Sequence, residues 1–101
     1  MYRKVFNEIL YLMKLFTFQR AGLTGLRYLN LSENFIYDIN LKAFSNLESL
    51  TVLDLSKNNI DYINPETFIN NTNLKILNLS RNKFNMHVPE LQSTSLTVSF
   101  F

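Results

Sequence analysis

The chain of 101 residues contains no cysteine, which excludes disulfide bonds, thiolate zinc sites and a cysteine nucleophile within it. Its formal net charge is only +2, so it lacks the basic excess that would indicate nucleic-acid binding. No apolar run approaches the ~20 residues of a membrane-spanning helix. What remains is one small domain, or part of one, in which 47% hydrophobic residues can build a core.

Few side chains are suited to catalysis. His87 is the only histidine, and no cysteine or carboxylate motif accompanies it, so we expect a surface or partly buried side chain rather than a ligand or base. No phosphate-binding loop, nucleophile elbow or metal-ligand spacing occurs. We therefore predict a protein that is not an enzyme, with no catalytic residues, no cofactor and no metal.

Leucine and asparagine are abundant instead, with 17 and 14 residues. Three eleven-residue segments align without a gap, starting at residues 26, 50 and 74, which are 24 apart: LRYLNLSENFI, LTVLDLSKNNI and LKILNLSRNKF. Leucine recurs at their first, fourth and sixth positions and asparagine at the ninth. A fixed period of this length indicates a solenoid of stacked coils.

The pattern LxxLxLxxNxL, followed by a variable part with a phenylalanine, resembles the leucine-rich repeat family over residues 18–98. The 24-residue spacing resembles its typical subtype, which is common in animal receptor ectodomains such as those of Toll-like receptors. The resemblance implies an α/β solenoid, a horseshoe fragment with a short parallel β-sheet on the concave face and mostly loops or short helical turns on the convex face. We divide the chain into residues 1–22, a degenerate repeat or amphipathic N-terminal helix, residues 23–97, three repeats, and residues 98–101, the truncated start of another.

Side chains alternate along a strand, which predicts Leu29 and Leu31 inside the first coil and Tyr28, Asn30 and Ser32 outside it. The same alternation applies to the later coils. One coil alone cannot close a core, but stacked coils bury each other's leucine rows.

Each strand is followed by a sharp turn, whose backbone amides no strand neighbour can satisfy. A buried asparagine amide both donates and accepts hydrogen bonds, so it can bridge such groups. The sequence therefore predicts an asparagine ladder formed by Asn34, Asn58 and Asn82. On the far side of the coil we expect Phe44 and Phe68 to stack. Asn71 interrupts the apolar column to which Leu47 belongs.

The two ends depart from the repeat. Apolar residues at helical spacing favour a helix or a degenerate repeat before residue 23: Val5, Ile9, Leu12, Met13 and Phe16. A secretory signal is the weaker alternative, because Asn7, Glu8 and Lys14 interrupt the apolar segment.

At the C-terminal end, Val98 and Phe101 continue the 24-residue period, whereas Leu96 restarts it after 22 residues. Either frame predicts a unit that is cut off, so the chain resembles a fragment. Uncapped ends of a solenoid expose a strand edge, which predicts self-association.

Outward columns on the predicted sheet supply the candidate partner-binding residues: Tyr28, Asn30, Glu33, Val52, Asp54, Lys57, Ile76, Asn78 and Arg81. An apolar stripe, a polar stripe and a charged margin suit a protein ligand. Residues of these types also suit a strand and its turn, which is the alternative interpretation. Asp54 is expected to project alone, and Tyr28 with the charged column is the least generic part.

Three N-x-S/T sequons begin at Asn30, Asn70 and Asn78 and are candidate glycosylation sites. Two of them arise from the repeat phrase LNLS. Asn70 lies in the loop-like stretch INNTN, outside the core repeat, and is the more informative one.

The resemblance implies a protein-recognition module that belongs to a cell-surface, signal-transducing receptor. In this hypothesis it lies on the extracellular side of the plasma membrane, within a longer protein, and binds a protein ligand or co-receptor through its concave sheet. One alternative is a cytoplasmic adaptor or scaffold, which the absence of cysteine favours. Another is a structural spacer in a longer array.

Overall fold

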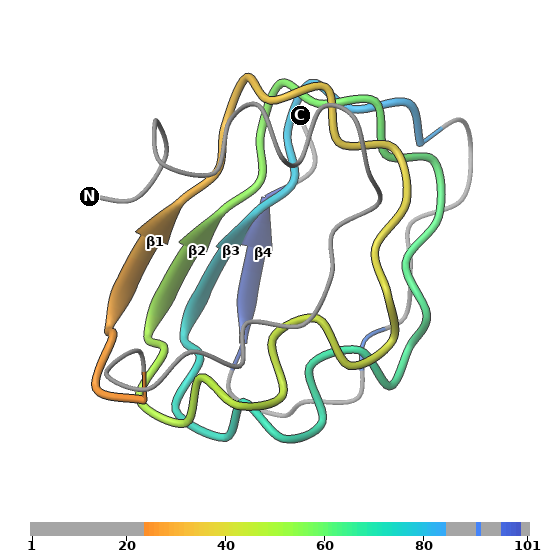
Figure 1. Ribbon diagram of the computed structural model, residues 1–101. Coiled ribbons are helices and arrows are strands. Elements are labelled where there is room, and N and C mark those ends of the chain that lie inside the picture. The colour runs from red at the N-terminus through yellow and green to blue at the C-terminus, as the bar shows by residue number, and fades with distance from the viewer. Residues whose placement is uncertain (1–23, 85–90, 92–95, 100–101) are drawn as a thin grey trace.

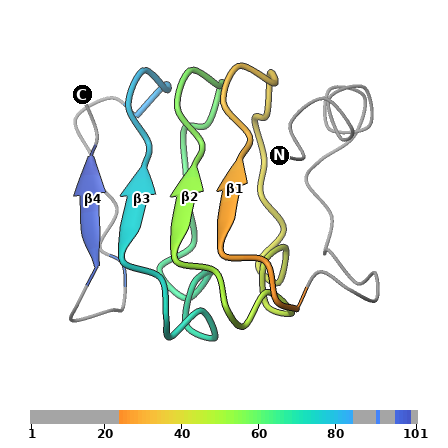
Figure 2. The same ribbon diagram turned by 90° about the vertical axis from the view of Figure 1, so that its left-hand side faces the viewer.

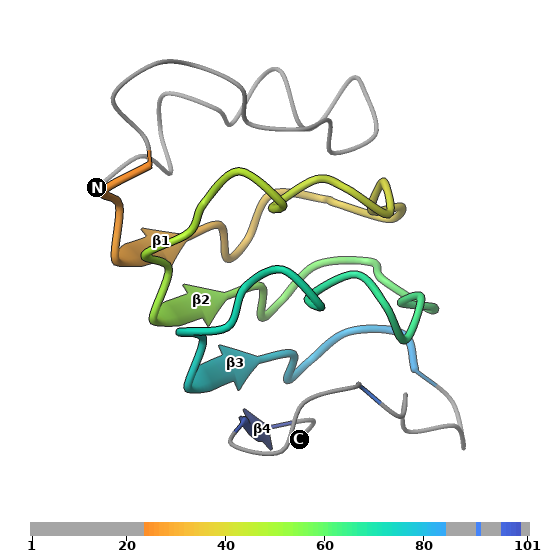
Figure 3. The ribbon, with the colours of Figure 1, turned by 90° about the horizontal axis from the view of Figure 1, so that it is seen from below.

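The computed structural model of the protein describes residues 24–84, 91 and 96–99. Four parallel strands form one sheet in the order β1 (Tyr28–Asn30), β2 (Val52–Asp54), β3 (Ile76–Asn78) and β4 (Thr97–Ser99) (Figures 1 and 2). After each of the first two strands the chain runs away from the sheet and returns beside the previous coil (Figure 3). The solenoid with its parallel sheet is therefore confirmed, and the described residues contain turns but no helix.

The leucine rows form the core, as the period predicts. Leu29, Leu53 and Leu77 lie opposite one another in the sheet, and all three are inaccessible to solvent. At the other end of the core, Phe44 and Phe68 stack with ring centroids 5.6 Å apart and planes 18° from parallel. Both predicted features are confirmed. All three coils contribute leucine at one end of a continuous apolar interior, and the first two contribute phenylalanine at the other.

The fourth strand corrects both registers expected at the C-terminal end. Val98 lies opposite Leu77, 21 residues along the chain from it. The 24-residue frame places Phe101 opposite Leu77, and the restart at Leu96 places Ser99 there, so both frames are wrong. Val98 packs against the core, while the residues on either side of it are exposed. Because side chains alternate along a strand, a shift by one residue would turn a polar side chain inward.

The asparagine ladder connects the coils at the turn after each strand. The Oδ1 of Asn58 accepts hydrogen bonds from the backbone amides of Asn34 (2.9 Å) and Ile36 (3.0 Å) in the preceding coil. Its Nδ2 donates to three backbone carbonyl oxygens, those of Leu31 (3.0 Å), Leu55 (3.0 Å) and Ser56 (3.1 Å). One buried side chain thus satisfies five backbone groups in two coils.

Asn82 repeats this role one coil further on. Its Oδ1 accepts from the Ile60 amide at 3.0 Å, and its Nδ2 donates to the Leu55 carbonyl at 2.9 Å. Asn34 donates within its own coil, to the Ser32 carbonyl at 3.0 Å, and among the described residues its Oδ1 meets no donor. The predicted ladder is confirmed at both junctions between the three described repeats.

The face opposite the sheet, called here the back face, consists of the turns at residues 40–47 and 64–71. Each begins with an asparagine, and these asparagines are 24 residues apart. The Oδ1 of Asn40 accepts from the Lys42 amide and that of Asn64 from the Glu66 amide, each at 2.9 Å. The side chain therefore initiates a series of reverse turns in both coils.

Asn71 forms a second bridge between coils, on the back face. It is buried in the position that Leu47 occupies one coil earlier, and its Nδ2 donates to the carbonyls of Phe44 (2.8 Å) and Leu47 (3.1 Å). The sequence pattern marked this residue as an interruption of an apolar column. Its Nδ2 satisfies two carbonyl oxygens of the preceding turn, which a leucine in this position could not do.

Several expectations lie outside the described residues. These are the helix or degenerate repeat at residues 1–22, the surroundings of His87 and the position of Phe101.

Replacing Asn58 by alanine should lower the free energy of unfolding by about 2 to 3 kcal/mol, because buried backbone groups in two coils lose their partner. Lys57→Ala next to it removes an exposed side chain and should cost at most about 1 kcal/mol. Urea unfolding of the full chain, followed by circular dichroism, measures both variants. Equal unfolding midpoints for the two variants would contradict the ladder as a main stabilising element.

Candidate recognition surface

The outward face of the strands carries a continuous row of apolar side chains. Tyr28, Val52 and Ile76 lie opposite one another in the sheet, and we call them the apolar stripe. Tyr28 is 57% exposed and Ile76 48%, while Val52 between them is half-buried. Neighbouring strands are about 4.8 Å apart, so the three side chains form one patch. The structure thus brings together three of the predicted contact residues.

The polar column beside the stripe has a local structural role. Its members accept hydrogen bonds from the backbone amide and hydroxyl of the serine two residues later, and they are Asn30 (3.0 and 2.7 Å), Asp54 (2.9 and 2.6 Å) and Asn78 (3.0 and 2.7 Å). The expectation that Asp54 projects alone is therefore wrong. Each of these oxygens holds the turn that follows its strand.

The serines themselves correct a further expectation. Ser32 and Ser56 are buried, and Ser80 is half-buried, although the alternation along the strand placed this column outside. The strands end at Asn30, Asp54 and Asn78, so the alternation does not extend to the serines. Their hydroxyls turn back to the side chain two residues earlier, which draws them into the turn.

A charged column borders the sheet, formed by Glu33, Lys57 and Arg81. All three are exposed and have φ angles of 57°, 56° and 56°, which is uncommon for residues other than glycine. Lys57 and Glu33 form an ion pair at 3.5 Å with both side chains about half exposed. Such a surface pair contributes roughly 0 to 1 kcal/mol to stability. This ion pair is therefore too weak to fix the arrangement of the three charged side chains. The repeated left-handed turn places the charges in a row.

Exposed aromatic side chains that the sequence analysis did not single out lie just beyond this column. Phe35, Tyr37 and Tyr62 are at least half exposed, and we call them the aromatic edge. Their two segments run side by side, since the Asn59 amide donates to the Ile36 carbonyl at 2.7 Å. Aromatic residues are enriched in protein interfaces, where they often dominate the binding energy. Their alternation with buried isoleucines was the signal in the sequence.

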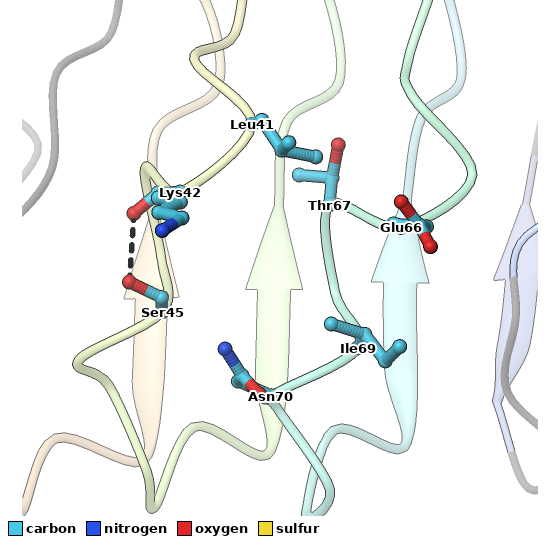
Figure 4. A pocket seen from close by; sticks show the side chains of 7 residues that line it. All are labelled: Leu41, Lys42, Ser45, Glu66, Thr67, Ile69 and Asn70. Atoms are coloured by element: carbon cyan, nitrogen blue, oxygen red, sulfur yellow. Dashed lines mark hydrogen bonds between the residues drawn. The ribbon is translucent and has the colours of Figure 1, made fainter.

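A pocket of about 190 Å³ opens on the back face between the turns of the first two coils (Figure 4). The side chains around it come from both turns and are Leu41, Lys42, Ser45, Glu66, Thr67, Ile69 and Asn70. Pockets for drug-sized ligands measure about 300 to 1,000 Å³, so this back pocket fits a single small ring or one side chain. Nothing in the repeat pattern indicated it, because these turn residues differ between coils.

The three sequons differ in their surroundings. Asn30 and Asn78 are half-buried at the ends of strands, and their oxygens are engaged in the turns described above. Asn70 is exposed at the rim of the back pocket.

Two properties of the described part of the chain bear on other kinds of site. Within residues 24–84, 91 and 96–99, no group of three histidine, cysteine, aspartate or glutamate side chains is placed to hold a metal ion. The same residues include no helix of the length and hydropathy needed to cross a bilayer.

Asp54→Asn should leave the free energy of unfolding within about 0.5 kcal/mol of the wild-type value, because Asn30 and Asn78 make the same turn in the neighbouring coils. Asp54→Ala removes the acceptor and should cost about 1 kcal/mol. Thermal melts of the two variants test this assignment. A loss of stability in Asp54→Asn as large as in Asp54→Ala would show that the carboxylate charge, and not the turn, is required.

Comparison with known families agrees with this architecture. The family model described as leucine rich repeat matches residues 21–84, and a second leucine rich repeat model matches residues 73–96. No curated protein and no solved structure matches the chain. Domains of this family are generally protein-interaction modules and typically have no enzymatic activity. The family match, which spans more than half of the chain, and the buried leucine rows with their asparagine ladder show that the chain belongs to the leucine-rich repeat family.

Proposed function

We propose that the chain recognises a protein partner through its sheet face and belongs to the extracellular part of a cell-surface receptor. The observation that supports this most is the apolar stripe, in which Tyr28 and Ile76 are exposed on either side of the half-buried Val52, in register across three coils. Burying such side chains against a partner stabilises a complex by about 25 cal/mol per Å² of apolar surface. The sheet beneath them is held by hydrogen bonds between coils, so little conformational freedom would be lost on binding.

The size of the sheet determines how much more of the surface must take part. Four strands of three residues measure roughly 10 Å along the chain and about 14 Å across. A stable protein interface covers about 800 Å² on each partner, several times this area. We therefore include the charged column and the aromatic edge in the proposed contact surface, next to the apolar stripe.

The charged column and the aromatic edge add charges and further aromatic side chains to the apolar stripe. Tyrosine and arginine are enriched at energetic hot spots. The stripe contributes Tyr28, and the neighbouring groups add Tyr62 and Arg81, all three exposed. The charged column changes sign along the array, from Glu33 to Lys57 and Arg81, which favours a partner surface with the opposite pattern. The polar column contributes less, because its oxygens are engaged in turns.

The receptor assignment is supported by the subtype of the repeat. The 24-residue spacing with a phenylalanine in the variable part resembles the typical repeats of animal ectodomains, and the two phenylalanines, Phe44 and Phe68, are buried and stacked. A cytoplasmic adaptor is the second candidate, favoured by the absence of cysteine. Surface biotinylation of intact cells that express the complete gene product distinguishes the two locations.

Binding is tested by screening the purified chain against an array of secreted proteins and cell-surface ectodomains. For a partner found there, Tyr28→Ala and Arg81→Ala should each raise the Kd at least tenfold, or about 1.4 kcal/mol. Asn46→Ala, an exposed change on the back face, serves as the matched control and should leave the Kd unchanged. A partner that binds both sheet-face variants as tightly as the wild type would exclude the sheet face as the contact surface.

A further inference from the structure

We propose that Asn70 carries an N-linked glycan whose first N-acetylglucosamine lies in the back pocket, while Asn30 and Asn78 stay unmodified and the sheet face stays bare. This inference rests on the extracellular location proposed above. It assigns a modification site, Asn70, and an occupant for the back pocket. The back face would then carry the glycan, and the sheet face would remain available for a partner.

The sequon at Asn70 has the geometry that modification needs. Asn70 and Thr72 are both exposed, whereas Asn71 between them is buried. The inward direction of Asn71 is fixed by its hydrogen bonds to the carbonyls of Phe44 and Leu47. The alternation therefore presents the acceptor amide and the sequon hydroxyl to solvent, and a large substituent on Asn70 displaces nothing in the core.

The other two sequons lie in the sheet. The hydroxyl of Ser32 donates to the Oδ1 of Asn30 at 2.7 Å, and Ser80 and Asn78 form the same pair. In each sequon the hydroxyl is thus bonded to the amide oxygen of the asparagine that would carry the glycan. Asn78 also lies between β2 and β4, with neighbouring strands about 4.8 Å away on each side. In the folded sheet both asparagines are half-buried and bonded to their serines, so we expect folding to compete with their modification.

The back pocket provides a place for the first sugar. In Figure 4 the amide nitrogen of Asn70, where a glycan is attached, points toward the space between the two turns. Leu41 and Ile69 border this space and are both exposed, which offers apolar contact to a sugar ring face and an acetamido methyl group. Lys42 and Glu66 at the rim offer a donor and an acceptor to sugar hydroxyls. The volume of about 190 Å³ suits one ring and not a longer chain.

The modification itself is a substitution at the anomeric carbon. The Nδ2 of Asn70 attacks C1 of the N-acetylglucosamine of a lipid-linked diphosphate oligosaccharide. The N–C1 bond forms, the C1–O bond to phosphate breaks, the lipid diphosphate leaves, and one amide proton is released. No oxidation or reduction is involved, and the oligosaccharide donor is the only co-reactant.

The first experiment maps the site. The full chain is directed into the secretory lumen of animal cells by a cleavable signal peptide, and material from the lumen is used so that export is not required. Deglycosylation by peptide N-glycosidase in ¹⁸O-water converts each modified asparagine to labelled aspartate, which peptide mass spectrometry detects. We expect the label at Asn70, and its loss in Asn70→Gln and in Thr72→Ala. Label at Asn30 or Asn78, or an unlabelled Asn70, overturns the assignment.

The second experiment tests whether the first N-acetylglucosamine lies in the back pocket. Thermal melts compare the high-mannose form, the form trimmed by endoglycosidase H to a single N-acetylglucosamine, and the sugar-free Asn70→Asp variant, which matches the charge left by peptide N-glycosidase. The single-sugar form should melt as high as the full glycan and about 3 °C or more above the sugar-free variant. Leu41→Asp should abolish this difference, whereas Asn46→Asp on the same turn should keep it. If the single sugar leaves the melting temperature unchanged, the proposal that it lies in the back pocket is wrong.

Both experiments place the chain in the lumen without a partner. Loss of the glycan assignment is therefore distinguishable from loss of the recognition proposal, which is decided by the Kd of the sheet-face variants.

Discussion

The hydrogen-bonding needs of the turn backbone constrain this solenoid more than any other interaction. Each coil leaves the sheet through a sharp turn whose amides and carbonyls are buried, and an unsatisfied buried group costs about 1 to 3 kcal/mol. The asparagine of the following coil supplies the missing partners, as Asn58 does for Asn34, Ile36 and Leu31. Leucine burial supplies most of the driving force, but it has no direction. The hydrogen bonds of the asparagine side chains therefore fix how one coil is aligned with the next.

That alignment also creates the surface. In the first three strands, residues 24 apart lie opposite each other. One outward position per coil therefore forms a column of side chains across the sheet. The column of Asn30, Asp54 and Asn78 is occupied with its own turns. The apolar stripe, the charged column and the aromatic edge lie at the surface beside it, on a sheet that hydrogen bonds between the coils hold together.

The two faces differ because the sequence repeats strictly on one and loosely on the other. On the sheet face the strands recur with little change. On the back face Asn71 replaces a leucine and bonds to the preceding turn, and the turns beside it leave a small pocket. Variation is tolerated there because reverse turns satisfy much of their backbone locally, as the amides bonded to Asn40 and Asn64 illustrate.

The sequence by itself determined the stacked coils, the inward leucines, the ladder and the paired phenylalanines. These follow from a period and from residue types whose burial or hydrogen bonding has one good solution. Only the tertiary structure decided the register of Val98, the burial of Ser32, the bridge made by Asn71 and the back pocket. The partners in these cases are backbone carbonyls, a side-chain oxygen two residues earlier or side chains of another coil. The register, the bridge and the pocket leave no repeated pattern in the sequence, because they depend on the loop length and local geometry that folding sets. The serine contact does recur in each coil, but the period alone does not show that the strand ends before the serine.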